Sequence, residues 1–432
     1  MFEALGIADF RLLWFARSVS LLGSWLLVVA VPAHVFTLTG SVAATGLTLA
    51  AEFLPPLLLA PLAGILADRV DRRRLMIGAD AARAAVVLLL LLVRDPDDVW
   101  LVYVALTAEA TGTTLFRPAA QSHTPSLVGT GTALSSANAL NATTDGTVRL
   151  VAAPLGGALY AWIGFAPLVS LNAATYVVSA AALLLTTPLT RPARARAAPT
   201  HTEPPRAEVA AGHLAAEAAA EATAAETAGS GGVRHLRAAL RQAPTARTLL
   251  LVNTVFLGAN ASLSALLVPY GITVLGGPAQ IGLVMSALGI GFLLGAPLTR
   301  ALVDRAAPAY LLGAALATTA VGYLLLFSAT NLATALPAAV VIGTAGSTVL
   351  SATQTTLQRA TPNAVLGRTA ALLLTGEAAA TLLGALAGPA AAQALSPTWA
   401  AVLAATITAL TAAAATLRLP RTTAEASPAA TS

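Results

Sequence analysis

The chain has 432 residues, of which 57% are hydrophobic and only 10% are charged, and its mean hydropathy is +0.78. Soluble domains carry about 25% charged residues, so this composition excludes an ordinary water-soluble fold. The absence of cysteine excludes disulfides, thiolate metal sites and thiol nucleophiles. All 24 basic residues are arginines, and long runs such as 249–280 and 310–358 contain no charge at all. Lipid is the natural solvent for such runs.

Twelve apolar stretches, each long enough to cross a membrane, follow one another along the chain. A helix needs roughly 20 residues to span a hydrocarbon core of about 30 Å. The first six predicted helices cover 12–36, 43–66, 74–93, 99–119, 137–161 and 165–187. The second six cover 247–271, 279–302, 308–328, 332–355, 365–390 and 397–417. We therefore expect an all-α integral membrane protein of about twelve transmembrane helices.

The arginines predict the orientation and the domain boundaries. Most of them fall in loops on one side of the predicted membrane, whereas the other side has only Arg94, next to Asp95, Asp97 and Asp98. Because positive charge is enriched on the cytoplasmic side, we expect both termini to be cytoplasmic. The predicted domains are an N-terminal bundle (1–187), a cytoplasmic linker with a possible surface helix (188–246), a C-terminal bundle (247–417) and a disordered cytoplasmic tail (418–432).

Two matches indicate an internal repeat. Pro61, Leu62, Leu66, Asp68 and Arg69 recur 236 positions later as Pro297, Leu298, Leu302, Asp304 and Arg305. Gln121, Thr124 and Pro125 recur 237 positions later as Gln358, Thr361 and Pro362. Two matches at nearly the same offset predict two duplicated six-helix bundles related by pseudo-twofold symmetry.

The segment from Gly64 to Arg74, GILADRVDRRR, resembles the loop between the second and third helices of the major facilitator superfamily, although the family pattern has Gly where this chain has Asp71. The segments 116–119, 137–141 and 154–157 resemble the branch that contains macrolide-efflux and siderophore-export proteins. Residues 357–368 extend the similarity into the second half. The resemblance covers nearly the whole chain except the linker and the tail.

This resemblance implies a cytoplasmic gate. Residues of the loop would hold the two bundles together when the transporter is closed to the cytoplasm, with a weaker counterpart in the second half. The predicted gate residues are Gly64, Asp68, Arg69, Arg72, Arg73, Asp304 and Arg305. The alternative is that the arginines only determine the topology.

Ionisable residues inside predicted helices need a partner or a function, because each costs about 2.5–3.5 kcal/mol to insert. We identify Glu52, Glu109, Asp145, Arg149 and Glu377 as candidates for proton coupling. Asp145 and Arg149 have the i, i+4 spacing of a helical ion pair, and Arg149 could also reach Glu109. A static buried ion pair is the alternative for these three.

Glu52 and Glu377 have no cation nearby in the sequence. Hydrocarbon surroundings favour the neutral form of a lone carboxyl group, so these two could bind and release protons during transport. The alternative is a neutral glutamic acid that is hydrogen-bonded for structural reasons.

Four asparagines, Asn138, Asn141, Asn253 and Asn260, are candidates for lining a polar substrate cavity, although helix capping and interhelical hydrogen bonds explain them equally well. The sequence has no phosphate-binding loop, metal-binding spacing or nucleophile motif. We therefore expect no enzymatic activity, no cofactor, no metal and no nucleic-acid partner.

The sequence predicts a secondary active transporter of the bacterial inner (plasma) membrane. We expect it to act as a monomer and to export a small molecule, such as a drug or secondary metabolite, in exchange for protons. Import of a metabolite is one alternative, and a transporter-like receptor or scaffold that moves no substrate is another.

Overall fold

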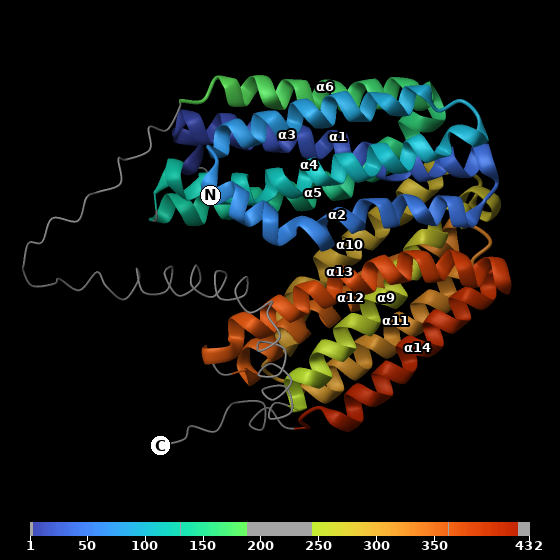
Figure 1. Ribbon diagram of the computed structural model, residues 1–432. Helices are drawn as coiled ribbons and strands as arrows, with labels where there is room; N and C mark the ends of the chain where they lie inside the picture. The colour runs from blue at the N-terminus through green and yellow to red at the C-terminus, as the bar shows by residue number, and fades with distance from the viewer. Residues whose placement is uncertain (1–2, 130, 188–243, 362, 422–432) are drawn as a thin grey trace, which may run out of the picture.

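The computed structural model describes residues 3–129, 131–187, 244–361 and 363–421, except the side chains of residues 61, 68, 135 and 363–371. The predicted linker helix and most of the predicted tail lie outside these residues, as does the side chain of Asp68. Figure 1 shows two groups of long helices, one formed by the first part of the chain and one by the second.

The described residues form twelve long helices and no strand. The first half contains α1 (Ala8–Thr39), α2 (Val42–Arg69), α3 (Arg72–Val87), α4 (Val99–Val128), α5 (Thr132–Ile163) and α6 (Phe165–Leu184). The second half contains α9 (Pro244–Tyr270), α10 (Pro278–Leu302), α11 (Pro308–Ser328), α12 (Leu332–Ala360), α13 (Asn363–Ala394) and α14 (Pro397–Arg418). Short helical turns η2 (Leu88–Leu92) and η4 (Gly271–Leu275) continue α3 and α9.

Eleven of these helices contain a described stretch long and apolar enough to cross a membrane. The exception is α5, which has 32 residues but carries Asp145 and Arg149 together with several polar side chains. The prediction of an all-α membrane protein is confirmed. Several helices extend farther than their apolar stretches predict, and α4 reaches Val128 instead of residue 119, because a helix does not have to end where its side chains become polar.

The same helix pairs pack together in both halves of the chain. In the first half, α1 packs on α5 and α6, α2 on α4, and α3 on α4 and α6. In the second half, α9 packs on α13 and α14, α10 on α12, and α11 on α12 and α14. This arrangement agrees with the internal repeat in the sequence.

The two halves contact each other through α5 with α10 and α2 with α13. A Cβ atom at Gly157 of α5 would collide with the Pro278 carbonyl of α10, and one at Gly46 of α2 would collide with Pro389 of α13. These contacts lie near the end that carries Arg94. Towards the opposite end, which carries Arg69 and Arg72–Arg74 and which we call the arginine-rich end, the halves diverge (Figure 1).

Glycines allow close helix packing inside the second half. Gly291 of α10 lies against the Val340 carbonyl of α12, and Gly384 of α13 lies against the Gly258 carbonyl of α9. Small residues let membrane helices approach closely enough for backbone contact.

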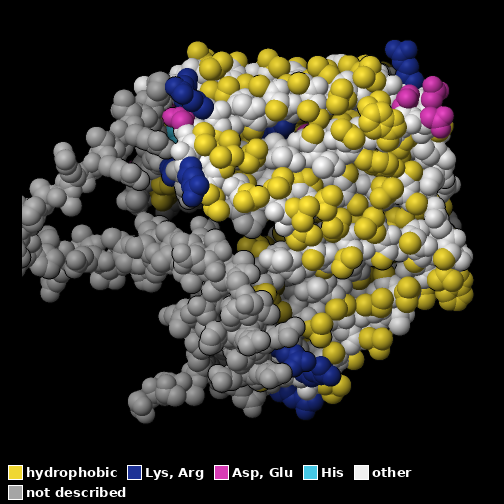
Figure 2. All heavy atoms as spheres, in the orientation of Figure 1, with side chains coloured by type: hydrophobic (Ala, Val, Ile, Leu, Met, Phe, Trp, Pro, Cys, Tyr) yellow, Lys and Arg dark blue, Asp and Glu magenta, His cyan; other side chains and the backbone are white. Residues whose placement is uncertain are grey.

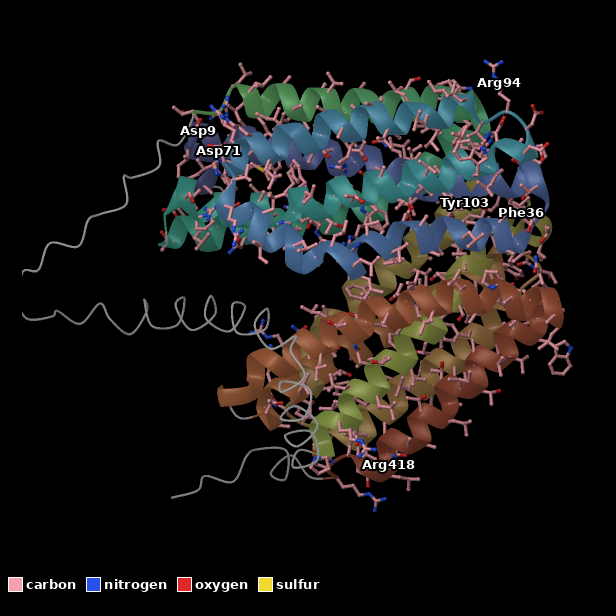
Figure 3. The ribbon with its side chains drawn as sticks, viewed as in Figure 1. Asp9, Phe36, Asp71, Arg94, Tyr103 and Arg418 are labelled. Carbon is pink, nitrogen blue, oxygen red and sulfur yellow. The ribbon has the colours of Figure 1, made fainter. Side chains whose placement is uncertain are left out.

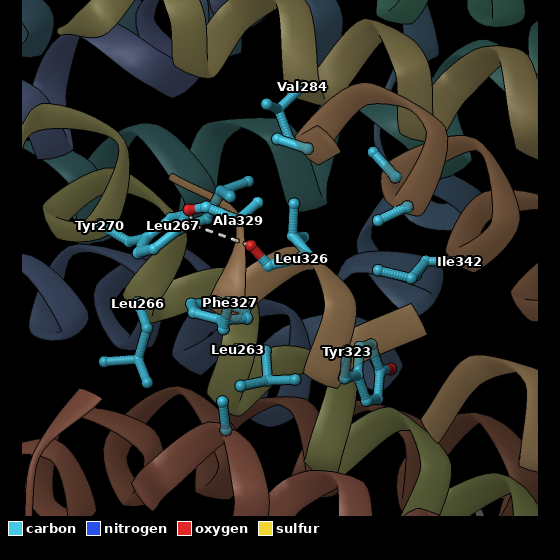
Figure 4. Packing of buried hydrophobic residues seen from close by; sticks show 14 of the residues in the cluster. Leu263, Leu266, Leu267, Tyr270, Val284, Tyr323, Leu326, Phe327, Ala329 and Ile342 are labelled. Atoms are coloured by element: carbon cyan, nitrogen blue, oxygen red, sulfur yellow. Dashed lines mark hydrogen bonds between the residues drawn. The ribbon is translucent and has the colours of Figure 1, made fainter. Parts of the chain in front are cut away.

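Apolar side chains also fill the second half near the Arg94 end. Tyr270, Leu326 and Phe327 belong to a buried cluster (Figure 4), and the Tyr270 hydroxyl donates a hydrogen bond of 2.8 Å to the Leu326 carbonyl. A buried tyrosine hydroxyl usually finds such a partner.

The outer surface is consistent with a lipid environment. Apolar side chains cover both halves between arginines at one end and a mixed charged group at the other (Figure 2). Arg94 belongs to this second group, and Asp71 lies at the opposite end (Figure 3). Exposed tryptophans mark the Arg94 end, at Trp100, Trp162 and Trp399. Tryptophan favours the interface between membrane and water.

Candidate functional site

A cavity of about 320 Å³ lies inside the first half, and we call it the main cavity. Every residue that lines it belongs to α1–α6 or η2. Its walls are partly apolar, with Trp25, Val28 and Phe53 among the lining residues. It also contains charged side chains, which are Arg17, Glu52, Arg83, Glu109, Arg117, Asp145 and Arg149.

Three of the predicted coupling residues lie at a similar depth in this cavity. Glu52, Glu109 and Arg149 are each roughly 25–29 Å from the arginine-rich end of their own helix, at about 1.5 Å per residue. They come from α2, α4 and α5. Charged groups from three helices therefore meet in the middle part of the bundle.

Arg83 of α3 forms the centre of a buried ion network. Its guanidinium donates hydrogen bonds to Asp80 at 2.8 Å and to Glu109 at 3.0 and 3.2 Å. The side chain of Arg83 is only 4% exposed and that of Asp80 is fully buried. Two carboxylates thus share one buried cation, and removing that cation would leave them uncompensated.

Tyr176 and Ser179 of α6 complete the network. The Tyr176 hydroxyl donates to Glu109 Oε1 at 2.6 Å, and its ring centroid lies 4.0 Å from the Arg83 guanidinium carbon. Ser179 donates to Asp80 at 2.5 Å. Thr113 also donates to Glu109 Oε1, at 3.1 Å. Donors from α3, α4 and α6 therefore converge on one oxygen of Glu109.

Glu52 differs from Glu109 in its surroundings. It lines the same cavity from α2, but no described residue forms an ion pair or hydrogen bond with its side chain. Glu52 is thus the carboxyl group of the main cavity without a described partner.

Asp145 and Arg149 do not form the predicted intrahelical pair. Asp145 instead accepts a hydrogen bond of 2.6 Å from Arg17 of α1. Arg149 lies over the ring of Trp25, with 5.1 Å between its guanidinium carbon and the ring centroid. Its predicted approach to Glu109 is also not made, because Arg83 occupies that carboxylate. A cation from another helix is better placed in both cases.

Glu377 lies in the second half and does not line the main cavity. Asn253 of α9 donates a hydrogen bond of 2.8 Å to it. Asn253 is 236 positions after Arg17, which makes the corresponding contact between α1 and α5 in the first half. The same helix pair is thus joined by a polar contact in each half, with a charged donor in one and a neutral donor in the other.

The four predicted cavity asparagines have different positions. Asn138 and Asn141 line a smaller cavity of about 160 Å³ in the first half. Asn253 binds Glu377, and Asn260 accepts a hydrogen bond of 3.2 Å from Tyr323. The two in the first half thus line a cavity, whereas the two in the second half make interhelical hydrogen bonds, which is the alternative that the sequence also allowed.

The predicted gate residues make their described contacts within their own halves. Arg72 donates to the Ser122 carbonyl at 2.7 Å, and Arg73 donates to the carbonyls of Leu183 and Leu184 at the end of α6. These bonds join α3 to α4 and α6 at the arginine-rich end. Asp71, which replaces the family's glycine, accepts a hydrogen bond from the Arg74 backbone and caps α3.

The counterpart in the second half is exposed. Asp304 pairs with Arg359 at 2.7 Å, and Arg305 donates to the Ala301 carbonyl of its own helix. Gly64 has open space where a Cβ atom would lie, and Arg69 ends α2. The role of these residues as a latch stays a prediction.

Asp80, Arg83 and Tyr176 belong to the network but were not predicted as site residues. Asp80 and Arg83 fall inside the predicted helix 74–93 at i, i+3 spacing, so the insertion cost of charged residues was a signal that could have found them. Tyr176 had no comparable signal, because its hydroxyl becomes important only when α6 packs beside α3 and α4.

Comparison with known proteins agrees with this architecture. Residues 2–202 match the family described as "Transmembrane secretion effector", and residues 249–432 match "Major Facilitator Superfamily". The chain belongs to the major facilitator superfamily. It is thus a multi-pass membrane protein of a transporter family.

Two curated relatives match parts of the chain. Macrolide efflux protein A of Streptococcus pyogenes is 35% identical over 121 residues, which are 28% of this chain and 30% of that protein. The uncharacterized MFS-type transporter YfiS of Bacillus subtilis is 28% identical over 169 residues, which are 39% of this chain and 40% of that protein. The matched regions therefore span less than half of these relatives.

Solved structures share the fold along nearly the whole chain. A bacterial homolog of the human lysosomal transporter Spinster, in an inward-facing and occupied conformation, has a TM-score of 0.71 at 16% identity and covers 98% of both chains. A POT family transporter in complex with a thioalcohol-conjugated peptide has a TM-score of 0.65 at 13% identity and covers 94% of both chains.

The ion network leads to a prediction about stability. Arg83→Gln should strongly destabilise the protein, by about 3–5 kcal/mol, because Asp80 and Glu109 lose their shared cation. Adding Glu109→Gln should recover much of this loss by removing one uncompensated carboxylate. Thermal unfolding of the purified variants in detergent measures both effects.

The matched control is Arg17→Gln. It breaks the ion pair between Arg17 and Asp145, whose side chains are 29% and 31% exposed. We expect a smaller loss there, because solvent screens the remaining charge. A double variant no more stable than Arg83→Gln would contradict the network.

Proposed function

We propose that this chain is a secondary active transporter of the bacterial plasma membrane that exports a small molecule in exchange for protons. The observation that carries the proposal is the main cavity, which places Glu52 beside the Arg83–Glu109 pair in the middle of the bundle. Its volume of about 320 Å³ suits a small ligand, since such sites are usually about 300–1,000 Å³. The similarity to macrolide efflux protein A supports export over import.

Alternating access would supply the transport cycle. The halves touch near the Arg94 end and diverge at the arginine-rich end, so rocking about this contact would expose the cavity to one side at a time. In the opposite state, the loop with Asp68, Arg69 and Arg72 would meet the second half and act as the proposed latch. We expect the protein to do this as a monomer.

Proton coupling is assigned to Glu52. Glu109 is fixed by Arg83 and Tyr176, and Glu377 is held by Asn253, whereas Glu52 has no described hydrogen-bond partner. Protonation of Glu52 removes a charge from the cavity and thereby changes the relative stability of the two transporter states. Only such a difference between states can couple protons to substrate.

Glu52→Gln should therefore abolish uphill export driven by a pH gradient while leaving downhill substrate exchange largely intact. Proteoliposomes with and without a gradient separate these two rates. Glu377→Gln keeps an acceptor for Asn253, so we expect this comparison variant to lose less of its uphill export. Unchanged uphill export by Glu52→Gln would move the coupling to another acid.

The orientation follows from the arginines, and we propose that the arginine-rich end is cytoplasmic. Reporter fusions after Asp97 should be active outside the cytoplasm, and fusions after Arg196 should be active inside it. The reverse pattern would invert the proposed direction of every step.

A further inference from the structure

A second cavity adjoins the main cavity at the arginine-rich end of the first half. It has a volume of about 160 Å³ and lies between α1, α4 and α5. Arg17 and Gln121 line both cavities. We call this smaller cavity the annex. The two shared residues place the annex directly beside the main cavity.

Three carboxamide side chains line the annex, at Gln121, Asn138 and Asn141. Among the described residues, none of them makes a side-chain hydrogen bond, and Asn141 Oδ1 is buried without a partner. The other polar groups are already occupied, since Trp14 donates to Thr144 and the Thr124 hydroxyl donates to a backbone carbonyl. Gln121 and Asn138 are exposed residues, whereas Asn141 Oδ1 is a buried acceptor. Because buried polar groups normally have partners, Asn141 is the main recognition group of the annex, and the amides of Gln121 and Asn138 are accessible beside it.

The charge of the annex indicates what these amides recognise. Among the described residues that line it, only Arg17 is charged, and its guanidinium donates a hydrogen bond of 2.6 Å to Asp145, which neutralises it. A carboxylate or phosphate ligand would have to displace Asp145, and an ammonium group would face Arg17. A carboxamide both donates and accepts hydrogen bonds, as hydroxyl and amide groups do. The annex therefore favours an uncharged polar group over an ion.

We propose that the transported molecule carries an uncharged group rich in hydroxyls or amides, which occupies the annex while an apolar part lies in the main cavity. This inference rests on the proposed transport function and specifies its substrate class. The annex has room for a group the size of about five water molecules, at roughly 30 Å³ each. Trp25, Val28 and Phe53 would contact the apolar part.

A matched pair of neutral probes tests the proposal. 2-Naphthyl β-glucoside carries a sugar on an aromatic ring, and 2-methoxynaphthalene carries the same ring without the sugar. We expect the purified protein in detergent to bind the glucoside at least about tenfold more tightly, because each good hydrogen bond changes affinity several-fold. Fluorescence titration measures both dissociation constants.

Asn141→Leu and Gln121→Leu should each reduce this preference about tenfold without weakening the binding of 2-methoxynaphthalene. The control is Gln358→Leu, which alters the repeat counterpart of Gln121. Gln358 is exposed on α12 and lines neither cavity. Thermal unfolding of each variant identifies any general loss of folding, and Asn138→Leu replaces a variant that does not fold.

The proposal is overturned if the wild-type protein shows no preference for the glucoside, which is the result expected of an annex that holds only water. It is also overturned if the annex variants weaken the binding of both probes equally. Uptake into energised inside-out vesicles separates this inference from the transport function. Preferential binding without uptake would contradict transport alone, and uptake of both probes without preference would contradict the annex alone.

Discussion

The buried guanidinium of Arg83 determines how the interior of the first half is arranged. A membrane offers no water to an unpaired charge, so the cation needs carboxylates, and Asp80 and Glu109 supply them. Satisfying this requirement draws α3, α4 and α6 together around one point, where Tyr176 closes the network. The positions of the Glu109 and Arg83 side chains are thereby fixed, and Glu52 is left as the carboxyl group in the cavity without a described partner.

The two halves share a packing scheme but differ in chemistry. The first half holds both cavities and the ion network, whereas residues 249–417 contain only two carboxylates, Asp304 and Glu377. Arg17 and Asn253 occupy corresponding positions, with a charged contact in one half and a neutral one in the other. We infer that the first half recognises substrate and protons, while the second half forms a largely apolar wall that moves against it.

The sequence predicted the helices closely because a membrane span depends mainly on local composition. Helix α11, for example, covers the predicted residues 308–328. The predicted ion pairs were less accurate, because they depend on which helices become neighbours. Spacing alone suggested an ion pair between Asp145 and Arg149, but Asp145 pairs with Arg17 of α1 instead. The sequence shows the four asparagines. Only the packing of the helices shows that Asn138 and Asn141 line a cavity, whereas Asn253 and Asn260 make hydrogen bonds between helices.

Distances between spin labels test alternating access of the two halves directly. The protein has no cysteine, so cysteine pairs can be introduced without removing native ones. One pair would join Arg74 and Gln358 at the arginine-rich end, and the other would join Asp97 and Thr398 at the Arg94 end. If the two halves alternate, a change of pH or substrate that shortens the first distance lengthens the second. Distances that stay constant, or that change in the same direction, would contradict alternating access.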